Sequence, residues 1–254
     1  MNLKEKVNSG MKITIITVCF NAAKTIERTF QSILNQTNSD FEYLIIDGKS
    51  QDCTMSIIKS WESRFIEKGI YFKVYSEKDS GLYDAMNKGA AKAKGRWIIY
   101  MNADDEFSDE NAIQYAEDNL VDYVDILYGN TIIVDGKTEI VQTALPIETI
   151  KKHLPFIPQS AFIKTELQKR YAFNLNYKIT ADYDCFLRMY IDGCQYKQID
   201  YCFSKFHMGG VSNKNEWKTY KEDIDVKHAN RVLNKYAPLQ IVKYVRRYLL
   251  EKLK

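Results

Sequence analysis

The stretch KITIITVCFNAAKTIERTFQSIL, residues 12–34, decides the fold class, because within it a strand pattern runs directly into a helix pattern. Residues 12–20 are rich in β-branched side chains, which are typical of strands. The apolar residues that follow recur at the spacing of one helix face: Ile26, Phe30, Ile33 and Leu34. We expect Asn21 to cap this helix. The stretch therefore predicts one strand followed by one helix.

The same alternation continues along the first hundred residues. Further strands are expected at 41–46, 70–75 and 96–101, and further helices at 55–65 and 83–93. Strands that alternate with helices of this length build βαβ units, in which helices cover both faces of a mostly parallel sheet. After Glu106 the alternation ends, and the runs 126–134 and 138–143, joined by Asp-Gly-Lys, predict a β-hairpin.

Composition and charge exclude several classes of protein. With 254 residues, 45% of them hydrophobic, the chain can bury a large core, so it is not a disordered protein. Residues 235–254 carry six Lys or Arg and one Glu, a net charge of +5, which leaves −2 for the rest of the total of +3. The main body is therefore not expected to bind nucleic acid. Five cysteines without a CxxC pair favour neither a disulfide framework nor a zinc site.

The two ends of the chain bear on its localisation. Residues 1–10 lack an apolar signal core, and no run approaches the roughly eighteen apolar residues that a membrane span needs. These observations predict a cytoplasmic protein. Apolar residues alternate with Lys and Arg over 238–254, which predicts a basic amphipathic helix. This helix either packs on the body or contacts a membrane, and the second alternative would place the protein at the inner face of the cytoplasmic membrane.

Polar residues follow each predicted strand of the first half. Because the carboxyl ends of parallel strands meet at one edge of a sheet, we expect these residues to form a ligand site. The turn CFNA, residues 19–22, has no glycine, which argues against a dinucleotide or P-loop fold. A diphosphate would then need a metal with hard oxygen ligands, and Asp104 and Asp105 suit Mg²⁺ or Mn²⁺. The alternatives are that these two acids cap a helix near Asp109 and that Asp47 is a turn residue.

Four segments, in this order and spacing, resemble family 2 glycosyltransferases, the inverting sugar-nucleotide enzymes of the GT-A fold: TVCFNA (17–22), IIDGKSQD (45–52), SEKDSGLYDAMNKG (76–89) and MNADDEF (101–107). The resemblance covers about residues 11–211 and implies an α/β, Rossmann-like sandwich with a mostly parallel central sheet. It implies a nucleotide-binding half over 11–106 and an acceptor-binding half over 107–211. Residues 212–254 would then form a C-terminal helical extension.

The resemblance places the donor site on residues of these segments: Thr17, Cys19, Asn21, Asp47, Ser50, Asp79, Gly81, Tyr83, Asp84, Asn87, Lys88, Asn102 and Ala103. By this likeness, Asp47 would accept a hydrogen bond from the N3–H of a uracil ring, which implies a UDP-linked donor. Gly81 and the residues after it belong to a loop and helix start near the diphosphate and sugar. Cys19 adjoins the nucleotide as a small apolar group rather than as a nucleophile.

The resemblance also implies a metal site. Asn102-Ala103-Asp104 occupies the position of the family's DxD motif, and Asp105 is the further acid that often follows it. Asn102 departs from the usual Asp, which makes Asp104 the principal carboxylate ligand for Mn²⁺ or Mg²⁺. His207, in the segment FHMGGVSN, is either a ligand of the metal or a phosphate, or a structural hydrogen-bonding residue.

The segment ITADYDCFLRMY, residues 179–190, resembles the part of the family that carries the catalytic base. Asp182 aligns with the base, Asp184 is the alternate candidate, and Ala181 stands where the family often has Glu. Inverting transfer needs such a group because the acceptor hydroxyl must lose its proton. Alternatively, Asp182 only caps a helix.

The segment PFIPQSAFI, residues 155–163, resembles an acceptor-side segment in which Gln159 and Ser160 would contact the acceptor. The resemblance thus implies a metal-dependent inverting glycosyltransferase of cell-surface glycan biosynthesis. It would move a sugar from a UDP-linked donor to a hydroxyl of a saccharide or lipid-linked acceptor.

Two other functions remain as alternatives. A sugar-phosphate nucleotidyltransferase shares a similar sheet, but its first strand would run into a Gly-rich loop, which CFNAA is not. A non-catalytic sugar-nucleotide or membrane-surface binding module would explain Asn102 and Ala181 as signs of a decayed site.

Overall fold

The computed structural model describes residues 12–208 and 216–232. Strands and helices alternate along the first half: β1 (Ile13–Cys19), α2 (Ile26–Leu34), β2 (Phe41–Asp47), α3 (Thr54–Glu67), β3 (Tyr71–Ser76), α4 (Leu82–Lys92) and β4 (Trp97–Tyr100). All of these elements were predicted from the sequence pattern. The predicted alternation of strand and helix is therefore confirmed.

Asn21 does not cap α2, contrary to the prediction. The helix begins at Ile26 after Thr25, and Asn21 adopts the left-handed backbone region with a φ of 52°. Its side-chain oxygen accepts a hydrogen bond from the backbone N–H of Gln51 at 2.8 Å. Asn tolerates this backbone region better than most residues. Asn21 thus joins the turn after β1 to the turn after β2.

The second half is less regular. Its elements are β5 (Glu106–Phe107), α5 (Ala112–Asn119), β6 (Ile126–Asp135), β7 (Thr138–Gln142), η1 (Ile147–Lys151), η2 (Pro158–Ser160), β8 (Ala161–Lys164), α6 (Thr165–Arg170), α7 (Ala181–Ile191), β9 (Tyr196–His207) and α8 (Glu216–Ala229). The strands β6 and β7 form the predicted hairpin. The cap of α5 is Asn111, so the alternative that Asp104 and Asp105 cap this helix is wrong.

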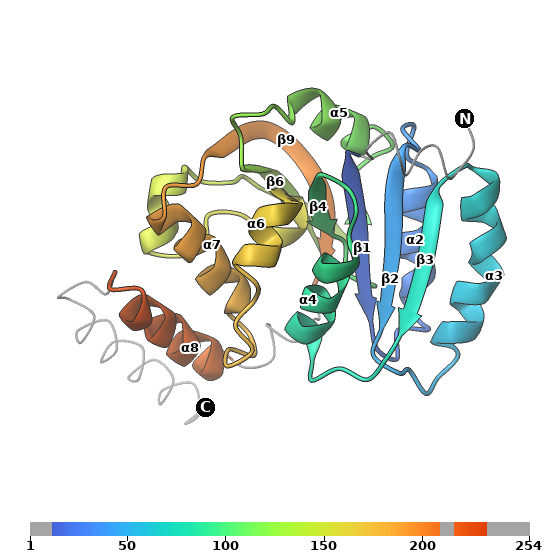
Figure 1. Ribbon diagram of the computed structural model, residues 1–254, viewed down its shortest axis with the longest axis horizontal. Coiled ribbons are helices and arrows are strands. Elements are labelled where there is room, and N and C mark those ends of the chain that lie inside the picture. Colours follow the sequence, from blue (N-terminus) through green and yellow to red (C-terminus); the bar gives the residue numbers. More distant parts are fainter. Residues whose placement is uncertain (1–11, 209–215, 233–254) are drawn as a thin grey trace.

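All strands of the described residues join one sheet in the order β3-β2-β1-β4-β8-β6-β9-β5, with β7 paired to β6 (Figure 1). The strands β1 to β4 pair in parallel, as βαβ units require. Antiparallel pairs enter with β8, β7 and β5, whereas β6 and β9 pair in parallel. The fold is therefore a mixed α/β fold with one curled sheet.

Helices cover both faces of the sheet and enclose two cores. The helices α4, α6 and α7 lie on one face, and α2, α3 and α5 lie on the other (Figure 1). The strand β1 contributes Ile16 and Val18 to the first core, and Ile13 and Ile15 to the second. A strand buried on both faces reads as a continuous apolar run, which is why β1 lacks a polar alternation. Burying each such side chain contributes roughly 1.5–3 kcal/mol.

The helix α8 lies beside α7, and its Val226 is buried in the same core as α4 and α7 (Figure 1). The basic segment 238–254 lies outside the described residues, so its contact with a membrane stays a prediction from sequence. Across residues 12–208 and 216–232, no helix has the length and apolar character to cross a membrane.

Candidate active site

A pocket of about 690 Å³ lies at the carboxyl ends of β1 and β4 and extends to the start of α7. Its lining includes many of the residues predicted from the sequence: Cys19, Asn21, Asp79, Gly81, Tyr83, Asn102, Ala103, Asp104, Asp105, Gln159 and Asp182. The fold thus brings the candidate donor, metal and base residues together, although they are as much as 163 positions apart (182 − 19) in the sequence.

Two candidate donor residues, Thr17 and Asp47, lie behind the pocket wall. Thr17 is buried and donates to the backbone oxygen of Met101 at 2.7 Å. Asp47 is also fully buried, and its carboxylate accepts hydrogen bonds from the Ser76 hydroxyl at 2.6 Å and the Ser50 amide at 3.2 Å. These bonds tie the end of β1 to β4 and the end of β2 to β3. We call Thr17, Asp47 and Ser50 the floor of the site. The turn-residue alternative for Asp47 agrees with this geometry.

Cys19 lines the pocket and is buried. Burial, and then the charge of Asp47, raises the pKa of the Cys19 thiol well above its ordinary value. The thiol therefore stays neutral near pH 7 and is a poor nucleophile. This agrees with a small apolar role.

The loop before α4 is shaped by its own acids. Gly81 has a φ of 126°, a backbone conformation that favours glycine. Its N–H donates to Asp79 at 2.9 Å, while Asp84 accepts from the Ser80 N–H at 2.9 Å and pairs with Lys88 at 3.2 Å. Asp84 and Lys88 therefore hold the loop conformation, and Asp79 and Gly81 line the pocket.

Two further residues of α4 hold the segment that precedes the candidate base Asp182. The Tyr83 hydroxyl donates to the backbone oxygen of Ile179 at 2.6 Å. The Asn87 amide bonds to both the N–H and the carbonyl of Phe173, each at 2.9 Å. The third sequence motif thus connects the donor side of the pocket to the base side.

The loop after β4, which carries the candidate metal ligands, is held from below by α2. The Thr29 hydroxyl donates to the carbonyls of Asp105 at 2.7 Å and Asn102 at 3.2 Å, and the Arg28 guanidinium donates to that of Asp104 at 3.1 Å. Arg28 and Thr29 were missed from the sequence. The only signal was a polar Thr29 between apolar residues on the buried face of α2.

Asn102 and Asp104 offer hard oxygen atoms to the pocket. The side-chain oxygen of Asn102 is buried and has no hydrogen-bond partner within the described part of the chain. The carboxylate of Asp104 is half-buried, and this burial raises its pKa, while Arg28 and His207 act in the opposite direction. No group of three or more His, Cys, Asp or Glu side chains in residues 12–208 and 216–232 could hold a metal. An ion at these two residues would need phosphate and water oxygens to complete its coordination, which is common for Mg²⁺.

Asp105 and His207 are already engaged by the fold. The Asp105 carboxylate accepts from the Gln159 amide at 2.9 Å and from the His207 N–H at 3.3 Å. Burial and the charge of Asp104 raise the pKa of Asp105 well above its ordinary value. The His207 ring lies 2.7 Å from Glu106. For His207 this geometry favours the structural alternative over the ligand.

Asp182 lies in the first turn of α7, after the cap residue Thr180, so it is not the cap itself. Its side chain is half-buried in the pocket wall and accepts a hydrogen bond from the Tyr183 N–H at 2.8 Å. Burial raises the pKa of Asp182 to about 6, although the Tyr183 N–H and the Tyr83 hydroxyl act in the opposite direction. A carboxylate with this pKa is ionised at neutral pH and is well matched to accept a proton.

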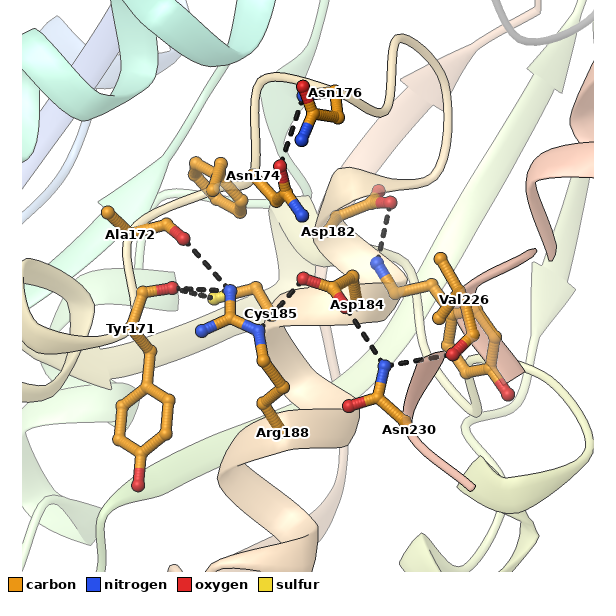
Figure 2. Close-up of polar contacts among 12 residues, drawn as sticks. Tyr171, Ala172, Asn174, Asn176, Asp182, Asp184, Cys185, Arg188, Val226 and Asn230 are labelled. Carbon is orange, nitrogen blue, oxygen red and sulfur yellow. Dashed lines mark hydrogen bonds and ion pairs between the residues drawn. The ribbon is translucent and has the colours of Figure 1, made fainter. Parts of the chain in front are cut away.

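Asp184, the alternate candidate, does not line the pocket, and its carboxylate faces Arg188 and Asn230 (Figure 2). It is only 3% exposed, and its two oxygens are bonded to Arg188 at 2.8 Å and Asn230 at 3.0 Å. Arg188 also donates to the backbone oxygens of Tyr171 and Ala172. This network makes Asp184 a structural residue that fixes α7 to its neighbours.

Of the two candidate acceptor residues, one lines the pocket and the other is buried in the core. Gln159 lines the pocket, and because its amide nitrogen faces Asp105, its oxygen is left without a partner in the described residues. Ser160 is fully buried and bonds to the hydroxyls of Thr131 at 2.7 Å and Ser204 at 2.6 Å. The Gln159 oxygen is therefore buried without a partner, whereas Ser160, from η2, joins β6 to β9.

The order of these residues along the chain and around one pocket can be compared with known proteins. The sequence model of the family described as "Glycosyl transferase family 2" matches residues 14–190. The chain belongs to glycosyltransferase family 2. The family segment thus contains both the loop after β4 and the turn with Asp182, and it ends before β9 and α8.

Similar proteins of known name are also glycosyltransferases. A "PGL/p-HBAD biosynthesis glycosyltransferase" of Mycobacterium tuberculosis is 27% identical over 70% of this chain and 69% of the relative. The cholesterol galactosyltransferase of Borreliella burgdorferi is 31% identical over 40% of this chain and 27% of its own length.

The structural neighbours show the fold. S. aureus TarS 1–349 in complex with UDP-GlcNAc superposes with a TM-score of 0.70 at 17% identity, over 89% of this chain and 68% of that one. The mannosyltransferase PcManGT from Pyrobaculum calidifontis, in complex with GDP-Man and Mn²⁺, has a TM-score of 0.68 at 16% identity, over 88% of this chain and 65% of that one.

Proposed function

We propose that this glycosyltransferase moves a sugar from a nucleotide diphosphate donor, preferentially UDP-linked, to an acceptor hydroxyl with inversion at the anomeric carbon. The observation that carries the proposal is that Asp104 and Asp182 line one pocket, with Asp182 at a pKa of about 6. Asp104 would bind the donor diphosphate through a metal, and Asp182 would accept the proton of the acceptor hydroxyl.

The reaction is an in-line displacement. The acceptor oxygen forms a bond to the anomeric carbon as the bond from that carbon to the diphosphate breaks. The proton of the acceptor hydroxyl passes to the Asp182 carboxylate, and the nucleoside diphosphate leaves with the bonding electron pair. Asp182 is ionised at neutral pH because its pKa of about 6 lies below it.

The buried, unpartnered oxygen of Asn102 and the carboxylate of Asp104 fit a divalent cation such as Mn²⁺ or Mg²⁺. When bound, such a cation stabilises the charge that develops on the departing diphosphate. Arg28 and Thr29 hold the loop, and through it these two ligands, in place. The Mn²⁺ complex of the mannosyltransferase supports a metal here.

A UDP-linked donor is supported by the UDP-GlcNAc complex of TarS, which shares the fold. The donor nucleoside would lie over the floor built by Thr17, Asp47 and Ser50. With Asp47 buried, its carboxylate would act on the nucleoside by fixing Ser50 and Ser76 around the site.

The acceptor side of the pocket is apolar around its polar groups. Phe156 and Ile157 precede Gln159, and Phe186 follows Asp182 by one turn of α7; all three line the pocket. Such a wall suits a hydroxyl attached to an apolar group, so we favour a lipid-linked over a purely saccharide acceptor. The name of the Borreliella burgdorferi relative, a cholesterol galactosyltransferase, supports an acceptor hydroxyl on an apolar group.

The test is calorimetric titration of UDP, GDP and UDP-sugars into the protein, with Mn²⁺ and with chelator. We expect UDP and one UDP-sugar to bind only with the metal. Transfer to lipid-linked acceptors is then measured with that donor, and the anomeric configuration of the product is determined by NMR.

Binding of none of these nucleotides would contradict the proposal. It would favour the non-catalytic alternative, in which Asn102 in the metal loop and Ala181 before Asp182 mark a decayed site.

A further inference from the structure

A single carboxylate of α8 lies against the turn that begins α7. Glu222 accepts hydrogen bonds from three consecutive backbone N–H groups, those of Lys178 at 3.0 Å, Ile179 at 2.8 Å and Thr180 at 3.1 Å. The Thr180 hydroxyl also lies 3.4 Å from the same oxygen of Glu222. The base Asp182 follows two residues later.

These contacts place a negative charge just before the start of α7. The N–H groups around a helix start lack partners within the helix, and a negative charge there is favourable. The side chain of Thr180, the cap residue of α7, makes no capping hydrogen bond. Glu222 binds the N–H groups of the turn that leads into α7 and supplies a negative charge there from another helix, 42 residues beyond Thr180 in the sequence.

The turn is held from its other side by α4. The Tyr83 hydroxyl donates to the Ile179 carbonyl, so the peptide groups on both sides of Ile179 are fixed by side chains from different elements. Since Asp182 lies in the first turn of α7, its carboxylate is positioned by this pair of contacts.

Helix α8 is also fixed to α7 at its other end. The Asn230 amide donates to Asp184, which pairs with Arg188 on the next turn of α7 (Figure 2). Between the two contacts Val226 is fully buried. The packing of α8 against α7 therefore fixes the position of Glu222.

We propose that Glu222 is a positioning residue for catalysis: from α8, beyond the segment that the family model matches, it holds the turn that presents Asp182 to the acceptor. The inference rests on the proposed role of Asp182 as the base. It connects α8 to the active site, although none of the described side chains of α8 lines the pocket.

The groups around Asp182 define what a change of Glu222 does. Its charged and titratable neighbours are Tyr83 from α4, Cys185 on α7 and Glu222 on α8, and Asp79 and Lys178 line the same pocket. Burial is the main cause of the raised pKa of Asp182, and the negative charge of Glu222 adds to it. A neutral residue at 222 therefore lowers the pKa of Asp182.

The experiment compares Glu222→Gln with Asp225→Asn, which removes one charge from an exposed site on the same helix. The pKa of the Asp182 carboxyl is measured by ¹³C NMR, with its signal assigned from Asp182→Asn. The same variants are assayed for transfer. We expect Glu222→Gln to lower this pKa and to shift the acid limb of the pH profile of kcat to lower pH. We also expect kcat to fall about tenfold, while the donor KM changes by less than about twofold.

In Asp225→Asn we expect both the pKa and kcat to match the unmodified protein. Equal pKa and kcat values in Glu222→Gln and Asp225→Asn would overturn the proposal. A loss of thermal stability in Glu222→Gln with an unchanged pKa and acid limb would also overturn it, since that is a purely structural role. Failure of the proposed function is seen separately, as absence of transfer by the unmodified protein, because the NMR titration needs no substrate.

Discussion

The two ends of the pocket are built in different ways. The donor end lies at the carboxyl ends of β1 to β4, where successive strands deliver Cys19, Asp47 and the Asn102 loop to one edge of the sheet. The base end is one turn of helix, held by α4 through Tyr83 and by α8 through Glu222. Sheet topology alone brings the first set together, whereas the second depends on side chains far apart in the sequence. We therefore expect substitutions at the base end to change proton transfer, and those at the donor end to change binding.

The largest expected effect is at the base end. Replacing Asp182 by Asn keeps the size of the side chain and an oxygen for the Tyr183 N–H, but removes the proton acceptor. We expect kcat to fall by about 10² to 10⁴ while donor affinity stays within about twofold. Steady-state kinetics and calorimetry measure the two quantities. Full transfer by this variant would show that Asp182 is not the base.

At the donor end, Asp104→Ala should change binding. Since it removes the proposed carboxylate ligand of the metal, we expect metal-dependent affinity for UDP to fall at least about 100-fold. Asn102→Asp is the matched variant with the opposite expected effect. It adds a carboxylate beside Asp104 and should strengthen Mn²⁺ binding. Calorimetry with and without chelator measures both. Equal metal dependence in all three proteins would remove the metal from this loop.

Asp184→Asn separates the two acids of α7. This change weakens the ion pair with Arg188 at 2.8 Å but leaves the pocket lining intact. We expect a loss of about 2 kcal/mol in the free energy of unfolding by urea, because Arg188 keeps its charge without a charged partner. The acid limb of kcat should not move. If the acid limb of kcat shifted in Asp184→Asn and stayed unchanged in Asp182→Asn, Asp184 would be the base and Asp182 the structural residue.

The smallest expected effect is a gain of stability in Asp182→Asn. The fold raises the pKa of Asp182 from an ordinary value near 3.8 to about 6, so the folded protein binds its proton more tightly than the unfolded chain. The contribution of Asp182 to stability therefore falls as the pH rises from about 4 to 6. The variant Asp182→Asn does not titrate and avoids this loss. For a half-buried group we expect about 1–2 kcal/mol at pH 7, measured by thermal unfolding at pH 7 and pH 4. An equal difference at both pH values would contradict this origin.

The same contrast explains what the sequence could predict. The strand and helix periods of residues 12–101 are local, so the parallel half and its strand-end residues were found without a structure. The assignment of Asn21 as a helix cap failed because a residue type favoured at caps also suits a left-handed turn.

The supporting residues could not be predicted, because nothing near them in the sequence indicates their partners. Glu222 contacts residues more than 40 positions away, and Thr29 contacts the loop 73 to 76 positions away. Ser160 and Asp184 matched family segments, but the sequence did not reveal that they point into the core and not into the pocket.

The most direct test of the central claim is the dependence of kcat on pH, measured with saturating donor and Mn²⁺ from about pH 4.5 to 8. We predict that kcat rises through a single ionisation near pH 6, the pKa of Asp182, and reaches a plateau near neutral pH. Glu222→Gln should move this ionisation to lower pH, and the residual activity of Asp182→Asn should lack it. A kcat that is flat through pH 6 in the unmodified protein, or the same ionisation in Asp182→Asn, would contradict the assignment of Asp182 as the base.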